Sequence, residues 1–251
     1  MPATLESNLR ETLQKIGAEA RRYGRSAGDV RLLAVTKSVG SRTAQELVRL
    51  GQKDLGENRL ASLVEKRASL EAAGLTATWH FIGQIQRNKA RRVIQNSEVL
   101  HSVDSLKLIE TLERIASEEK REVGVYLEVK LSSESTKHGF AAKDLTAAVE
   151  YVGTAQHLKL LGLMTMAPRP QPGDNSQDQA DKAFGDLEAI ALKLQENPEH
   201  CAAFEDQKVR LSMGMSGDFK TAIQRGSSIV RIGSALFHDI TTDTPTSGVA
   251  S

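Results

Sequence analysis

The sequence predicts an α/β fold: a single (β/α)8 TIM-type barrel with an extra N-terminal helix. Eight short apolar segments recur along the chain, and each of the first seven is followed by a helix-like stretch. The length of 251 residues also suits this fold, because a (β/α)8 barrel typically needs about 250 residues. A doubly wound open sheet is the alternative, since it shares the alternation of strands and helices.

The extra helix is predicted before the first strand. Apolar residues recur there at steps of three and four, which is the spacing of one helix face; they are Leu5, Leu9, Leu13, Ile16, Ala20 and Tyr23. Gly24 follows, and glycine is favoured just after the last turn of a helix. We therefore expect the helix to end near this residue.

The eight predicted strands are continuous in apolar character rather than alternating. They cover residues 31–36, 54–58, 79–83, 99–103, 123–129, 158–164, 209–212 and 229–232. Continuous apolar runs are typical of parallel strands that helices cover on the outside. Predicted helices between them include residues 41–50, 105–121 and 218–225.

The chain is expected to form one domain over residues 1–240, because no interdomain linker is visible. Residues 241–251 are small and polar, which predicts a disordered tail. Residues 167–175 contain three prolines and predict an extended loop after the sixth strand.

Composition excludes several classes of function. Lys and Arg number 33 against 32 Asp and Glu, and this balance argues against a nucleic-acid or membrane binder. A single cysteine, Cys201, supports neither an internal disulfide nor a multi-cysteine zinc site. The first residues lack the pattern of a secretory signal, and no apolar run is long enough to span a membrane. We therefore expect a cytoplasmic protein.

Lys37 is the strongest candidate for a reactive residue. It directly follows the first predicted strand, so its ammonium should emerge at the mouth of the barrel, where barrel active sites lie. Partial burial of a lysine favours the neutral amine, and a neutral amine attacks aldehydes to form a Schiff base. The plainer alternative is a solvated lysine at a strand end.

Two loops predict a phosphate site. Ser212, Met213 and Gly214 follow the seventh strand, and Gly233 and Ser234 follow the eighth. Loops after these two strands commonly bind phosphate in such barrels, through backbone N–H groups and hydroxyls. Two ordinary turns, with Ser216 as a helix N-cap, are the alternative. Together with Lys37, the loops indicate a phosphorylated aldehyde as the ligand.

Arg231 precedes the second of these loops. A guanidinium stays charged at physiological pH, so beside a pyridine nitrogen it would keep that nitrogen unprotonated. The ring would then be a weaker electron sink than the pyridinium that carbanion chemistry uses. An arginine paired with a carboxylate at a strand end is the alternative.

Several long motifs in this order resemble the pyridoxal phosphate homeostasis protein family. They are Val35-Thr36-Lys37, Gly56-Glu57-Asn58-Arg59, Trp79-His80-Phe81-Ile82-Gly83-Gln84-Ile85-Gln86-Arg87-Asn88-Lys89, Gly162-Leu163-Met164-Thr165-Met166, Leu211-Ser212-Met213-Gly214-Met215-Ser216 and Val230-Arg231-Ile232-Gly233-Ser234-Ala235-Leu236-Phe237. The resemblance implies a barrel similar to the N-terminal domain of alanine racemase, with pyridoxal 5′-phosphate (PLP) bound as an aldimine to Lys37. It further implies phosphate contacts from Ser212, Met213, Gly214, Gly233 and Ser234, a ring nitrogen near Arg231, and a ring pocket lined by Asn58 and His80.

One stretch departs from the family pattern. His138 stands where the family usually has a small residue, which leaves the shape of that loop open. Lys137 matches a family lysine near the mouth, and Lys89 is a second amine that could relay an aldehyde. Solvent-facing charge is the alternative for both. Arg87, Lys89, Arg91 and Arg92 could suggest RNA contact, but a solvated helix end is the simpler interpretation.

Three functions remain open. The first is a carrier that buffers PLP and supplies it to apo-enzymes without catalytic turnover, as a monomer and with no metal. The second is a PLP-dependent amino acid racemase or lyase. In racemases of the alanine type a tyrosine from a second domain is the second base, but this sequence continues for only 14 residues after Phe237. The third is a barrel that binds another phosphate ester.

Overall fold

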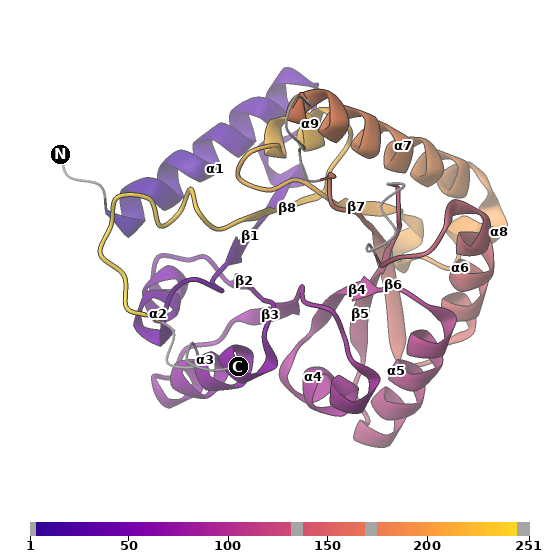
Figure 1. The fold of residues 1–251 in the computed structure, drawn as a ribbon, viewed down its shortest axis with the longest axis horizontal. Coiled ribbons are helices and arrows are strands. Elements are labelled where there is room, and N and C mark those ends of the chain that lie inside the picture. The colour runs from indigo at the N-terminus through magenta and orange to yellow at the C-terminus, as the bar shows by residue number, and fades with distance from the viewer. Residues whose placement is uncertain (1–3, 132–137, 169–174, 245–251) are drawn as a thin grey trace.

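A computed structural model describes residues 4–131, 138–168 and 175–244. Its centre is a closed barrel of parallel strands in the order β1 to β8, and β8 pairs with β1 (Figure 1). This closure confirms the predicted barrel and excludes the open sheet. The strands are β1 Arg31–Val35, β2 Asp54–Glu57, β3 Thr78–Phe81, β4 Val99–Val103, β5 Val123–Glu128, β6 Leu158–Met164, β7 Arg210–Ser212 and β8 Ile229–Ile232.

Helices surround the barrel on its outside (Figure 1). They are α1 Leu5–Arg22, α2 Ser41–Arg49, α3 Leu60–Ala72, α4 Ala90–Asn96, α5 Leu106–Glu119, α6 Leu145–Thr154, α7 Ser176–Glu196, α8 Pro198–Cys201 and α9 Phe219–Gln224. Strand residues are therefore enclosed by the barrel interior on one face and by helices on the other. This enclosure explains the continuous apolar runs, and β4 for example is buried along its whole length.

The predicted extra helix is confirmed as α1. A capping box between Thr4 and Ser7 satisfies its first N–H groups. Leu5 and Leu9 are buried as the periodicity predicts, whereas Leu13 is 46% exposed. The apolar stripe of α1 is therefore wider than the surface that its neighbours cover.

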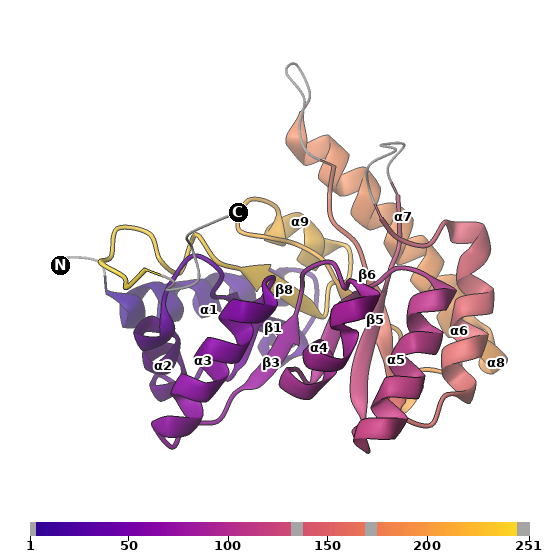
Figure 2. The ribbon, with the colours of Figure 1, turned by 60° about the horizontal axis from the view of Figure 1, so that its bottom comes forward.

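The carboxyl ends of the strands lie on one side of the barrel, where the chain runs from β6 towards the beginning of α7 (Figure 2). Most of the predicted proline-rich loop, residues 169–174, lies outside the described residues. On this side the chain also leaves β1 through Lys37 and β8 through Gly233.

Residues 241–244, which the sequence assigned to the tail, contact the beginning of α2. The N-cap of α2 is Gly40, which has no side chain to offer. The Asp243 carboxylate instead accepts hydrogen bonds from the N–H groups of Arg42 and Thr43, at 2.9 and 3.1 Å. Its backbone carbonyl accepts from the Gly40 N–H at 2.8 Å. Residues 245–251 lie outside the described residues.

Within the described ranges, no helix combines the length and apolar character needed to cross a bilayer.

Candidate functional site

Lys37 follows the end of β1 by two residues, as predicted. Thr36 before it is fully buried, whereas Lys37 itself is exposed. The Lys37 side chain makes no hydrogen bond or ion pair with any described residue. Its amine is therefore free to react at the carboxyl end of the barrel.

A buried ion pair holds the backbone just before Lys37. Glu57, at the end of β2, and Lys66, on α3, are 0% and 1% exposed and pair through Oε1 and Nζ. Lys66 Nζ donates to the Thr36 carbonyl at 2.7 Å, and the Thr36 hydroxyl donates to Glu57 Oε1 at 2.6 Å. The position of Lys37 thus depends on two charges inside the protein.

Asn58 follows β2 and is exposed at the same end of the barrel. Its backbone is fixed by a close approach from the segment after β3. A Cβ atom on Gly83 would lie 2.1 Å from the Asn58 carbonyl oxygen, so only glycine fits there. The side chain of Asn58 can therefore face a ligand while its main chain stays in place.

The turn after β7 lies beside the end of β8, from which the second predicted turn begins. The Arg231 N–H donates to the Gly214 carbonyl at 2.8 Å, and Gly214 has a φ of +95°, a conformation that favours glycine. Within the described chain, the backbone N–H groups of Gly214 and Ser234 make no hydrogen bond. Two unpaired donors are therefore available for an anion.

These turns also lie close to β1. Ala34 pairs with Ile232, and a Cβ atom on Gly233 would lie 3.0 Å from the Val35 carbonyl oxygen. Gly233 is thus two residues from Lys37 across the β1–β8 junction. Met213 is fully buried and supports the turn from inside rather than lining it with its side chain.

The helix-cap alternative for Ser216 is wrong. The N-cap residue of α9 is Asp218, whose carboxylate accepts from the Met215 N–H at 2.5 Å. Burial raises the pKa of Asp218. The loop between β7 and α9 is therefore closed by its own acidic residue.

Arg231 contacts oxygen atoms of two neighbouring strand ends. Its Nη1 donates to the carbonyl and hydroxyl oxygens of Ser212, at 2.7 and 2.8 Å, and its Nη2 donates to the Thr165 carbonyl at 2.9 Å. Among the described residues, Nε–H and the second Nη2–H have no partner. Burial lowers the pKa of Arg231 to about 10, so the guanidinium is charged at neutral pH.

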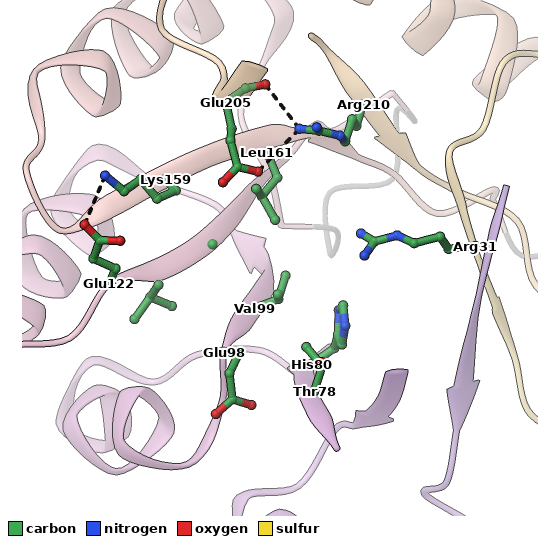
Figure 3. A pocket seen from close by; sticks show the side chains of 12 residues that line it. Arg31, Thr78, His80, Glu98, Val99, Glu122, Lys159, Leu161, Glu205 and Arg210 are labelled. Atoms are coloured by element: carbon green, nitrogen blue, oxygen red, sulfur yellow. Dashed lines mark hydrogen bonds and ion pairs between the residues drawn. The ribbon is translucent and has the colours of Figure 1, made fainter. Parts of the chain in front are cut away.

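His80 lies deeper in the barrel than the prediction of a ring-pocket residue requires. It lines a cavity of about 480 Å³ at the opposite end, where Arg31, Thr78 and Arg210 begin their strands (Figure 3). We call it the amino-end cavity. His80 contacts His101, which in turn contacts Ser212. A direct contact of His80 with a ring held at Lys37 stays a prediction.

His138 lies at the carboxyl end, where its ring contacts the Gln84 amide at 2.9 Å and the Asp104 carboxylate at 3.7 Å. It therefore links the segments after β3 and β4. Lys137 lies outside the described residues, and Lys89 is exposed. Arg91 pairs with Glu118 and Glu119 on α5, which supports the solvated-helix interpretation of the basic cluster.

Comparison with known proteins shows the family. The family described as "Alanine racemase, N-terminal domain" matches residues 12–240. A pyridoxal phosphate homeostasis protein of Pseudomonas aeruginosa is 36% identical over 94% of this chain and 95% of its own length. The protein of the same name in Escherichia coli is 32% identical over 92% of this chain and 94% of its own length.

The chain belongs to the pyridoxal phosphate homeostasis protein family. The chain is similar to the solved structure of PipY of Synechococcus elongatus with PLP bound. The TM-score is 0.79 and the sequence identity is 29%, and the match covers 93% of this chain and all of the PipY chain. PipY without PLP gives a TM-score of 0.81 at 30% identity over the same shares. Alanine racemase of Clostridium difficile shares the fold, with a TM-score of 0.66 and 16% sequence identity. This match covers 93% of this chain and 63% of the racemase chain.

Sequence reasoning missed the residues that support the site from inside. In the sequence, Lys66 is one of several charged residues on a predicted amphipathic helix, and His101 is a polar residue in an apolar strand. A lysine on the buried face of α3 was the available signal for Lys66. No local pattern connects His101 to Ser212, which is 111 positions away.

Proposed function

We propose that this protein binds PLP covalently through Lys37 and serves intracellular PLP homeostasis as a carrier. One observation carries the proposal: a free lysine at the end of β1 lies beside two adjoining turns with unpaired N–H groups and a buried arginine. An amine for the aldehyde and donors for the phosphate are thus available at one end of the barrel. The names of the relatives, and PLP bound to PipY, support this ligand.

Each residue has a distinct part in the proposal. Bound PLP supplies an aldehyde that joins reversibly to amines and a ring whose electron-withdrawing power depends on protonation of its nitrogen. The N–H groups of Gly214 and Ser234 would hold the phosphate, in turns that Met213 supports from inside and Gly233 begins. A Cβ at Gly214 would lie 2.5 Å from Ala222, so the turn leaves no room for a side chain.

In this proposal Ser212 holds Arg231 and does not contact the phosphate. It is fully buried, and its hydroxyl already contacts both Arg231 and His101. The two unpaired N–H groups of Arg231 suit donation to an unprotonated pyridine nitrogen. Asn58 would face the ring from the end of β2.

The side chains favour storage of PLP over catalytic turnover. A charged arginine at the ring nitrogen disfavours its protonation and weakens the electron sink. Racemisation also needs a base on the second face, and none of the three tyrosines, all of which are among the described residues, lies at the barrel mouth. Tyr126 is buried inside the barrel against His101, Tyr23 is the C-cap residue just after α1, and Tyr151 lies on α6.

Borohydride reduction of protein incubated with PLP, followed by peptide mass spectrometry, tests the proposal. We expect a pyridoxyl adduct on Lys37 and its loss in Lys37→Ala. Lys53→Ala is the matched control, because Lys53 is also exposed but precedes β2 at the opposite end. Unmodified Lys37 in reduced wild-type protein would refute the covalent link and favour another phosphate ester as ligand.

Transfer to an apo-enzyme tests the carrier role. Reactivation by loaded protein in the presence of a trap for free aldehyde would indicate direct transfer, whereas complete suppression by the trap would indicate release into solution. Light scattering of the loaded protein tests the expected monomer, and cell fractionation tests the expected cytoplasmic location.

The match to the alanine racemase domain supports a second candidate function, that of a PLP-dependent racemase or lyase. This activity would exchange the α-proton of an amino acid with solvent in a Lys37-dependent manner. Absence of exchange across the common amino acids, in protein that carries the Lys37 adduct, would remove this candidate.

A further inference from the structure

A chain of hydrogen bonds crosses the barrel interior from Arg231 to the amino-end cavity. Arg231 Nη1 lies 2.8 Å from Ser212 Oγ, which lies 2.8 Å from His101 Nδ1. His101 Nε2 lies 2.9 Å from His80 Nδ1, and His80 Nε2 lies 3.2 Å from Asp54 Oδ1. The five residues come from β8, β7, β4, β3 and β2, so the chain joins both ends of the barrel.

Burial favours the neutral form of both imidazoles in this chain of hydrogen bonds at neutral pH. His80 and His101 are fully buried, and burial lowers the pKa of each, that of His101 strongly. The facing charges are Asp54, Arg31 and Glu98 around His80, and Arg231 and Arg31 around His101. Burial of Asp54 opposes its ionisation, but the hydrogen bond from His80 and the charge of Arg31 outweigh burial and lower the pKa of the Asp54 carboxyl, so it is ionised at neutral pH.

Only one arrangement of protons satisfies every contact. An ionised Asp54 only accepts, so His80 must donate from Nε2, and its Nδ1 then accepts from His101 Nε2. Nδ1 of neutral His101 accepts from the Ser212 hydroxyl. The Ser212 oxygen in turn accepts from Arg231. Every donor points away from the guanidinium and towards the carboxylate.

We infer that Asp54, His80, His101 and Ser212 form a positioning relay that orients Arg231 from the far end of the barrel. The relay deepens the function proposed above, because it acts on the residue assigned to the ring nitrogen. It commits the hydroxyl hydrogen of Ser212 to His101, so this hydroxyl holds Arg231 and has no hydrogen left for a phosphate. It also gives a buried role to two histidines that would otherwise be costly polar groups in the core.

The protein without PLP offers a direct test. Nitrogen NMR of histidine-labelled protein distinguishes the two neutral tautomers, since only one ring nitrogen carries hydrogen in each. We expect both buried imidazoles in the Nε2–H form at pH 7.5. A hydrogen on Nδ1 of either ring at that pH would overturn the relay.

Two variants measure its effect on Arg231. Asp54→Asn removes the terminal charge but keeps the shape, and Ser212→Ala removes the hydroxyl acceptor of Nη1 while its carbonyl acceptor stays. Glu122→Gln is the matched control, because Glu122 lines the same cavity and, among the described residues, pairs only with Lys159, at 3.2 Å (Figure 3). We expect both relay variants to shift the side-chain NMR signals of Arg231 in PLP-free protein, whereas the control leaves them unchanged.

PLP affinity is the second measurement. Loss of one hydrogen bond to a charged group predicts weakening of about tenfold for Ser212→Ala, and about threefold is expected for the more distant Asp54→Asn. Unchanged Arg231 signals in both variants would overturn the inference. Failure of wild-type protein to bind PLP would overturn the proposed function instead, while the tautomer result would stand by itself.

Discussion

Replacing Lys66 by methionine should destabilise the fold strongly. Methionine keeps much of the apolar volume of the side chain but removes the ammonium that pairs with Glu57 and holds the Thr36 carbonyl. Both charged groups are almost completely buried. The second oxygen of Glu57 is also buried and has no hydrogen bond within the described chain. The variant therefore leaves a carboxylate in the core with the Thr36 hydroxyl as its remaining partner.

The expected cost follows from this geometry. Removing one partner of a buried ion pair typically costs about 3–5 kcal/mol, because the other charge stays desolvated. The double variant Glu57→Gln, Lys66→Met removes that charge as well. Its destabilisation should be at least about 2 kcal/mol smaller than the sum of the single effects. Lys182→Met is the control, since Lys182 pairs with Asp186 on the exposed face of α7 and should cost less than about 0.5 kcal/mol.

Urea unfolding followed by circular dichroism measures each free energy of unfolding. A loss of less than about 1 kcal/mol in Lys66→Met would refute the reasoning, because a desolvated, unpaired carboxylate is incompatible with so small a cost. Additive effects in the double variant would refute the pairing itself. Where Lys66→Met still folds, PLP affinity should also fall, since Thr36 directly precedes Lys37.

Three further outcomes are expected. Stability should fall as the pH is lowered from 7.5 to 5.5, because the unfolded chain binds a proton at His101 below its ordinary pKa of about 6.5, whereas burial lowers the pKa of His101 in the folded protein well below that value. His101 alone predicts a loss of about 1.4 kcal/mol at pH 5.5. An equal free energy of unfolding in urea at both pH values would contradict this. Gly214→Ala should cost about 2–4 kcal/mol and weaken phosphate binding, because φ is +95° and the new methyl would lie 2.5 Å from Ala222; calorimetry with inorganic phosphate and urea unfolding check both effects. Asp243→Ala should cost about 1 kcal/mol through loss of the cap on α2, and Asp239→Asn, at an exposed residue nearby, should show no comparable loss in the same assay; asparagine is used there because Asp239 has a φ of +53°, which alanine disfavours.

The sequence alone determined the fold class and predicted which end of the barrel carries the candidate site. Apolar runs and helix periodicity depend on near neighbours, so the positions of β1 and α1 could be predicted from local pattern. Lys37 and Gly214 could be predicted because a strand end places its next residues at the barrel mouth whatever their side chains are. The motifs then carried the family resemblance.

Only the tertiary structure decided what each side chain contacts. It placed Lys66 on Glu57, Asp243 on the beginning of α2, and His80 against His101 deep in the barrel. Asp243 and Arg42 are 201 positions apart, and closure of the barrel brings them together. The other two contacts join neighbouring elements, β2 with α3 and β3 with β4. Burial then makes each contact strong, because a charge or imidazole removed from water must find its partner inside the protein.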